Sequence, residues 1–145
     1  MKRFTSILSW LFVLMLLAAC GAKATPAALQ FDNPYAPLPG DSDLMYDDIT
    51  IDSTSVFLTK SQPPQVLVNF AYFQPTPCYQ LRLEVSGPDE QNRIILKGYA
   101  VTKKDKPCNL MALATPLQAS LNLGSVPAGH YTVFLNDNQI GEFDS

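Results

Sequence analysis

The stretch Tyr79–Ser86, with the sequence YQLRLEVS, alternates apolar and polar side chains without a break. In a β-strand, successive side chains point to opposite faces of the sheet, so one face of this segment is apolar and the other is polar. Strict alternation predicts a strand with one face on a core and the other face, including Arg82 and Glu84, in water. Such strands are typical of antiparallel sheets.

Other segments on both sides of this stretch also favour strands. They are Ile49–Thr59, Val66–Phe73, Arg93–Thr102, Leu117–Leu123, Tyr131–Leu135 and Gln139–Phe143. Val66–Phe73 is apolar on both faces, so we expect it to be buried on both sides. Helical periodicity is almost absent, and the one candidate, Asn109–Ala114, could form a single turn before Thr115-Pro116 stops it. The pattern predicts an all-β, antiparallel β-sandwich of about seven strands.

A local signature near the C-terminus supports this class. The segment Leu123–Val133, LGSVPAGHYTV, resembles the corner that leads into the penultimate strand of fibronectin type III and related immunoglobulin-like domains. In those domains a tyrosine hydroxyl bonds back across a Pro-Gly corner. The resemblance implies that Pro127 and Gly129 form the corner and that Tyr131 is the corner tyrosine, with Val133 facing inward after it.

The region Ser53–Phe143 also resembles uncharacterised immunoglobulin-like domains of bacterial secreted lipoproteins. The shared features are a Pro-x-Pro-Cys sequence ending at Cys78, a second cysteine after a loop at Cys108, and a late Gly-x-Tyr-Thr-Val strand. This resemblance implies no known activity. Cys78 and Cys108 lie too close together for the inter-sheet pair of immunoglobulin domains, so we expect any bond between them to tie a strand's start to a loop or a helical turn at the same end of the sandwich.

The N-terminus reads as an export signal. Lys2 and Arg3 precede an apolar run, Ile7–Ala19, that ends in Leu-Ala-Ala before Cys20. This ending resembles the lipobox of bacterial lipoproteins, in which the cysteine sulfur receives a diacylglyceryl group and the chain is cut before it. The run is shorter than the roughly 20 residues of a transmembrane helix. An ordinary signal peptide with an incidental cysteine and an uncleaved anchor remain alternatives.

These features predict three parts: a signal peptide at 1–19, a lipidated flexible linker at 20–45, and a sandwich domain at 46–145. The expected partner of acylated Cys20 is the lipid bilayer, with the domain facing the periplasm or the exterior. Gly21 stands where lipoproteins retained at the inner membrane of enteric bacteria carry aspartate, which favours the outer membrane if the organism has two.

The cysteines and the charge fit an exported protein. With Cys20 assigned to lipid, Cys78 and Cys108 remain, and two such cysteines normally pair in an oxidising compartment. Two buried free thiols are the alternative, whereas two sulfurs and the single His130 fall short of a metal site. Without Lys2 and Arg3 the net charge is (10 − 2) − 13 = −5, which argues against nucleic acid as a partner.

Two segments upstream of the sandwich lack a clear pattern. The proline-containing chain through Gly40 favours a tether, although Phe31, Tyr35 and Leu38 packing onto the domain is an alternative. An acidic cluster follows at Asp41, Asp43, Asp47 and Asp48. It lacks the ligand spacing of an EF-hand, so we interpret it as solvated surface rather than a calcium site.

No catalytic constellation is apparent, and we expect neither enzymatic activity nor a cofactor. His130 follows Gly129 at the start of a strand, and nothing marks Ser125, Thr132 or Asp137 near it as an activated nucleophile. The sequence instead favours a binding module for another envelope protein, a peptide or a glycan. A passive structural component of the envelope, or less favoured a protease inhibitor, is the alternative. The candidate binding residues are Pro75, Thr76, Pro77, Lys103, Lys104 and Lys106.

Overall fold

A computed structural model describes residues 32–105, 108, 111 and 115–145. The predicted signal peptide, Cys20, Phe31, Lys106 and most of the candidate helical turn lie outside the described residues. Within the described part of the chain, no helix combines the length and the hydropathy needed to span a bilayer.

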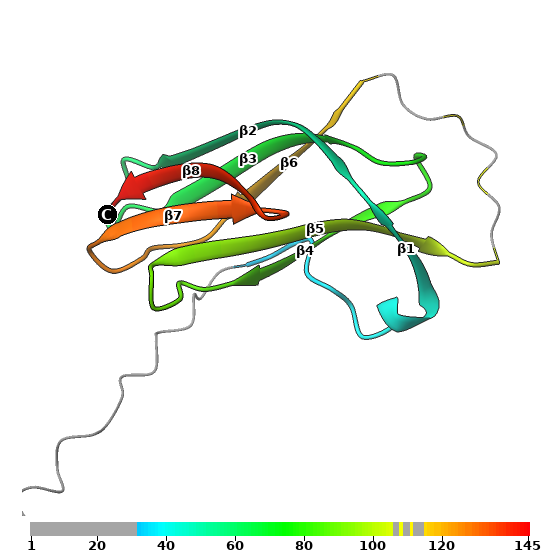
Figure 1. Cartoon of the computed structure of the whole chain (residues 1–145), viewed down its shortest axis with the longest axis horizontal. Coiled ribbons are helices and arrows are strands. Elements are labelled where there is room, and N and C mark those ends of the chain that lie inside the picture. The colour runs from blue at the N-terminus through cyan, green and yellow to red at the C-terminus, as the bar shows by residue number, and fades with distance from the viewer. Residues whose placement is uncertain (1–31, 106–107, 109–110, 112–114) are drawn as a thin grey trace, which may run out of the picture.

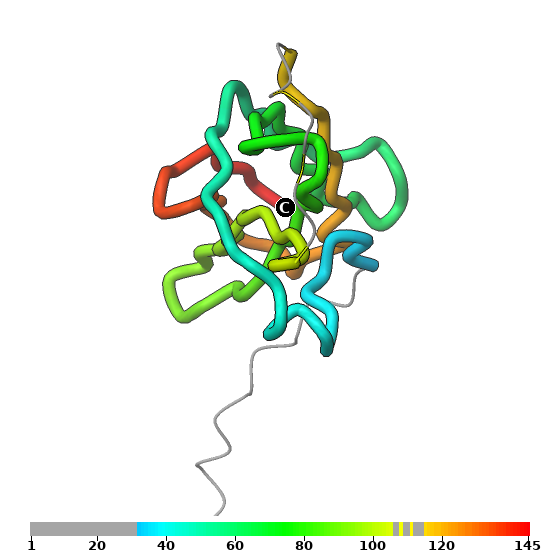
Figure 2. The backbone as a smooth tube through the Cα atoms, turned by 90° about the vertical axis from the view of Figure 1, so that its right-hand side faces the viewer, coloured from blue at the N-terminus to red at the C-terminus, as the bar shows by residue number. Residues whose placement is uncertain are grey.

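The structure confirms an all-β sandwich with two sheets. Its elements are the short 3-10 helix η2 (Asp41–Asp43) and the strands β1 (Leu44–Asp48), β2 (Thr50–Leu58), β3 (Val66–Phe73), β4 (Gln80–Ser86), β5 (Arg93–Lys103), β6 (Leu117–Asn122), β7 (His130–Leu135) and β8 (Asn138–Asp144). One sheet contains β1, β4, β5, β7 and β8, and the other contains β2, β3 and β6. Figure 2, turned by 90° from Figure 1, shows the backbone wound around the long axis of the domain.

Both sheets supply the core. Its fully buried side chains alternate along the strands with exposed ones, as the period of two predicts. The largest of them are Phe70, Leu83, Ile94, Leu96, Leu121, Leu123, Leu135, Val66, Val68, Val101 and Val133. The second face of β3 is covered less completely than we expected, because Leu67, Asn69 and Phe73 are only partly buried.

Strand β1 is an addition to the predicted set. It continues into β2 through the buried Ile49, where the chain leaves the five-stranded sheet and joins the three-stranded one (Figure 1). One long extended segment therefore contributes an edge to each sheet. The sequence analysis expected a strand only from Ile49, because the exposed Leu44–Asp48 segment includes part of the acidic cluster and lacks apolar alternation.

The pairing is mostly antiparallel, as expected, with one parallel pair. Strand β5 pairs with β7 in parallel, over Arg93–Leu96 and Thr132–Leu135. The chain reaches β7 only after crossing to the other sheet as β6, so it returns in the same direction as β5. Parallel neighbours require such a crossover, whereas a tight hairpin would give an antiparallel pair.

Residues before the expected domain start at 46 also bond to the sandwich. We call residues 33–43 the strap. The Asn33 side chain donates to the Leu83 carbonyl, and the Leu83 amide donates to the Tyr35 carbonyl, both at 2.8 Å. The Tyr35 side chain packs against the core, whereas Leu38 is exposed. The strap thus bonds to the edge of β4 that does not pair with β5. The chain then continues into β1.

A buried ion pair fixes the strap. Arg82 Nε lies 2.7 Å from Asp41 Oδ2, and Arg82 Nη2 donates to Asp41 Oδ1 at 3.2 Å. Arg82 and Asp41 are only 7% and 5% exposed, so the expectation that both face water is wrong. Arg82 does lie on the outward face of β4, but the strap covers it. Asp41 compensates its charge, since a buried charge without a partner is costly.

Replacing Asp41 with asparagine tests this role. The hydrogen bond from Arg82, with that of the Leu38 amide, lowers the pKa of Asp41. A lowered folded-state pKa stabilises the fold above the unfolded-state pKa, and the contribution is lost as the pH falls through the folded value. We therefore expect Asp41→Asn to lower the urea midpoint of unfolding at pH 7. Below about pH 4, the midpoint of the variant should decrease less steeply with falling pH than that of wild type.

Asp43→Asn is the matched control, because Asp43 lies in the same 3-10 helix and is exposed. It should leave both the midpoint and its acid dependence close to wild type. Asp89, whose pKa is also lowered by its hydrogen bond to Arg93, should maintain a residual acid dependence in every variant. Identical urea midpoints for Asp41→Asn and Asp43→Asn from pH 2 to 7 would contradict the role of the ion pair.

Candidate functional site

The predicted disulfide is present and joins two of the candidate loops. Cys78 and Cys108 are bonded with an S–S distance of 2.02 Å and a Cα–Cα distance of 5.9 Å. Cys78 immediately precedes Tyr79 and β4, whereas Cys108 follows β5 by five positions. Because β4 and β5 are paired, both cysteines lie at the same end of the five-stranded sheet. The expectation that the bond ties a strand's start to a loop is confirmed.

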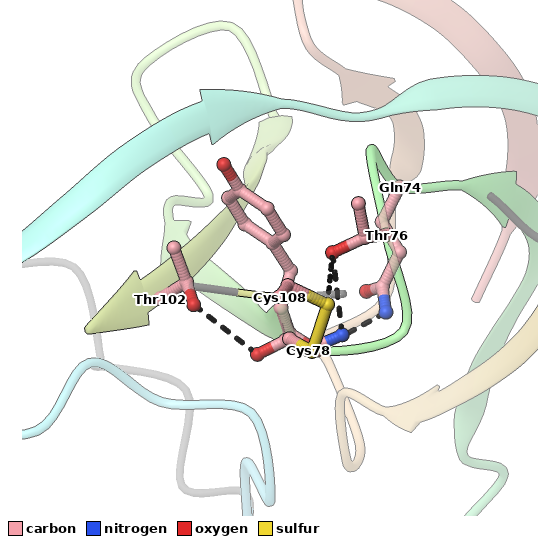
Figure 3. The surroundings of a disulfide bond; sticks show 6 residues. Gln74, Thr76, Cys78, Thr102 and Cys108 are labelled. Atoms are coloured by element: carbon pink, nitrogen blue, oxygen red, sulfur yellow. Dashed lines mark hydrogen bonds between the residues drawn. A yellow bond between two sulfur atoms is a disulfide. The ribbon is translucent and has the colours of Figure 1, made fainter. Parts of the chain in front are cut away.

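Hydrogen bonds shape the loop around Cys78 (Figure 3). Thr76 Oγ1 lies 3.1 Å from Cys108 Sγ, and the Thr76 carbonyl accepts from the Tyr79 amide. Gln74 Nε2 donates to the Tyr79 carbonyl at 3.1 Å, and Thr102 Oγ1 donates to the Cys78 carbonyl at 3.3 Å. The disulfide therefore holds this loop to the segment after β5, and the hydrogen bond from Thr102 holds it to β5 itself.

Gln74 and Thr102 are the supporting residues that sequence reasoning missed. Their polar side chains stand at the end of β3 and near the end of β5, where the strand pattern assigns them no partner. Gln74 Oε1 is also inaccessible to solvent and accepts no hydrogen bond from the described residues. The only available sequence signal was the position of Gln74 directly before Pro75.

The candidate lysines are brought to the same end of the molecule. Lys103 pairs with Leu44 of β1, and Lys104 follows it, both with exposed side chains. They line a shallow hollow that also contains Asp43 and Asp105. Two lysines and two aspartates give 2 − 2 = 0 net charge there, so this rim is polar rather than basic. Lys106 lies outside the described residues.

The loop end presents a braced surface rather than reactive groups. Pro75, Thr76 and Pro77 are partly exposed and Cys78 is exposed. Prolines and a disulfide restrict the conformations of the free loop, so a partner that binds it loses less entropy. Among the described residues, no cluster of three or more His, Cys, Asp or Glu side chains could hold a metal ion.

His130 lies in an exposed polar pair. Its Nδ1 is 2.8 Å from Asp144 Oδ1, and its Nε2 is 3.9 Å from Glu142 Oε2. The His130 side chain is 57% exposed and that of Asp144 is 86% exposed. Its hydrogen-bond partner is thus a carboxylate on the neighbouring strand β8.

The tyrosine at the corner is buried and bonded. Tyr131 is 3% exposed, and its hydroxyl donates to the Pro127 carbonyl at 3.0 Å. Its ring stacks on Phe143, with centroids 5.3 Å apart and planes 15° apart. Gly129 completes the corner by exchanging two backbone hydrogen bonds with Ser145. The corner therefore ties the start of β7 to the C-terminal residue.

Comparison with known proteins adds no relative to this description. No protein-family model, curated protein or solved structure matches the chain.

Substitutions at the corner should separate the ring of Tyr131 from its hydroxyl. Tyr131→Phe removes only the bond to Pro127 and should cost about 1–2 kcal/mol. Tyr131→Ala also empties the site beside Phe143 and should cost about 3–5 kcal/mol. His130→Ala, at an exposed position, should change the stability by no more than about 0.5 kcal/mol.

The measurement is urea unfolding of the protein with its disulfide intact. The phenylalanine variant is the control for packing, because it retains the stacked ring. A loss of stability in His130→Ala as large as that in Tyr131→Ala would show that the buried corner does not carry the stability assigned to it.

Proposed function

We propose that this protein is a lipid-anchored envelope lipoprotein whose β-sandwich is a non-catalytic binding module. The observation that carries the anchor is the pairing of cysteines. The chain has three cysteines, and Cys78 and Cys108 are bonded to each other. Cys20 is therefore bonded to neither of them, and it stands in the sequence that resembles a lipobox. The immunoglobulin-like relationship of the domain is part of this proposal.

The strap limits how far the domain extends from an acylated Cys20. Asn33 is already bonded to β4, so the residues between Cys20 and Asn33 number 33 − 20 − 1 = 12. Twelve residues reach at most about 43 Å at full extension. The proposed domain thus stays close to the bilayer, and its partners are molecules of the envelope: another protein, a peptide or a glycan.

The braced loop end is the proposed contact surface of the module. The disulfide fixes Cys78 against the loop after β5, and Thr76 is held beside Cys108. Loops that are ordered before binding retain more of their contact energy as affinity. The exposed Lys103 and Lys104, on the same end, add hydrogen-bond donors to the rim.

The anchor is tested by substitution of Cys20. We expect wild-type protein to label with a fatty-acid analogue and to fractionate with membranes. Cys20→Ala should accumulate as an unlabelled precursor that retains residues 1–19, because the acceptor sulfur is absent. Cys78→Ala/Cys108→Ala is the control for loss of cysteine as such, and it should still label at Cys20. Wild-type protein that does not label would exclude the anchor.

The contact surface is tested by site-specific photo-crosslinking in intact envelopes. A photoreactive residue at Lys104 should give a discrete adduct, whereas one at the exposed Asp52 of β2 should not. Removal of the disulfide by Cys78→Ala/Cys108→Ala should diminish the adduct, since the loop end is then no longer braced. Equal crosslinking from Lys104 and Asp52, or none from Lys104, would favour a passive structural component instead.

A further inference from the structure

The five-stranded sheet contains a break in its strand pairing beside β5. Along one edge of β5, the pairing with β7 ends at Leu96 and the pairing with β1 begins at Tyr99. Asn136 fills the break: its Oδ1 accepts from the Gly98 amide at 2.7 Å, and its Nδ2 donates to the Gly98 carbonyl at 2.9 Å. The Asn136 side chain thus replaces the backbone of a neighbouring strand as the hydrogen-bond partner of Gly98. Because a side chain is smaller than a strand, space remains beside it.

That space is an open hollow of about 580 Å³ between the end of β7 and the end of β1, at Asp48. A second hollow, of about 350 Å³, continues from it and shares Asp48, Lys97 and Tyr99 as walls. We call the two together the β5 groove. The groove belongs to the outer face of the sheet and does not include the disulfide-bonded loops.

Two tyrosines form one wall of the β5 groove. The rings of Tyr46 and Tyr99 have centroids 5.3 Å apart and planes tilted by 36°. The Tyr46 hydroxyl donates to the Asp41 carbonyl at 3.1 Å, and the Tyr99 hydroxyl donates to Glu84 Oε1 at 3.0 Å. Hydrogen bonds therefore hold both rings in place, Tyr46 through the strap and Tyr99 through Glu84 of the groove wall. Tyr46 nevertheless remains 55% exposed, so its ring is available for contact.

The hydroxyl of Tyr99 remains a neutral donor. Burial, together with the neighbouring Glu84, raises the pKa of Tyr99 to about 12. Glu84 therefore accepts its hydrogen bond from a neutral hydroxyl, and it lies opposite Lys97 in the register of β4 and β5. The hydrogen bond thus holds the Tyr99 ring and the Glu84 carboxylate together in the wall of the groove.

The charge of the β5 groove is negative. Its lining contains four carboxylates, from Asp47, Asp48, Glu84 and Asp137, and one ammonium group, from Lys97. The sum is 1 − 4 = −3. Carboxylates beside the exposed ring of Tyr46 suit a cation, because the ring face attracts positive charge as the carboxylates do.

We propose that the β5 groove binds an extended, positively charged peptide segment, with one lysine or arginine side chain against Tyr46 and Glu84 and the rest of the segment along the hollow beside Asn136. A neutral glycan fits the groove less well, because it would leave the excess of negative charge uncompensated. This binding is independent of the lipid anchor and of the braced loop end.

Fluorescently labelled tetralysine is the probe, and its affinity for the full-length protein in detergent is measured by anisotropy. Glu84→Gln and Tyr46→Ala should each raise the Kd about fivefold or more, because one removes a charge and the other a ring. Asp52→Asn is the matched control: it removes the same charge from β2 in the other sheet, and it should change the Kd less than about twofold. Increasing salt should weaken binding to wild type.

Urea midpoints of all variants are measured alongside to show that they remain folded. An equal effect of Asp52→Asn and Glu84→Gln would assign the binding to net charge and overturn the proposal. So would a lack of tetralysine binding, or preferential binding of a neutral N-acetylglucosamine tetramer that Glu84→Gln does not change. Loss of membrane attachment in Cys20→Ala would leave tetralysine binding intact, which separates this proposal from the anchor.

Discussion

The hydrogen-bonding capacity of β5 is the constraint on which the rest of the structure depends. One of its edges is filled by β4, and the other is divided between β7 and β1, with the Asn136 side chain between them. Backbone groups of a buried strand need hydrogen-bond partners. Because β7 and β1 share one edge of β5, the pairing with β7 ends at Leu96 and the pairing with β1 begins at Tyr99. Gly98 lies at the break, where a β-carbon would come within 2.9 Å of Ile49 Cδ1.

The second organising interaction is the ion pair between Asp41 and Arg82. It lies on the outer face of the five-stranded sheet and attaches the strap there, so the domain includes residues that the proline content assigns to a tether. The Asp41 carbonyl in turn accepts a hydrogen bond from the Tyr46 hydroxyl. One buried charge pair therefore connects the N-terminal approach of the domain to the aromatic wall of the β5 groove.

The molecule thus offers two surfaces of different construction. The loop end is braced by a disulfide and by side-chain hydrogen bonds, and its lysines are balanced by aspartates. The β5 groove is part of the sheet and has an excess of negative charge. A module close to a membrane would then be able to contact one partner through its loops and a basic segment through its sheet, since neither surface overlaps the other.

The sequence by itself determined every strand except β1, because alternation depends only on which side chains leave water: Leu81 and Leu83 point inward, and Tyr131 begins an inward series. It also predicted the bond between Cys78 and Cys108, because the N-terminal pattern favours export and two cysteines in an oxidising compartment normally pair. Only the tertiary structure decided the parallel pair of β5 and β7, the strap, and the groove beside Asn136. Each of these depends on which distant segment lies against a strand's edge or polar face, and the period of two carries no information about that. Arg82 shows the difference: alternation placed it on the outward face, but only the fold placed Asp41 over it.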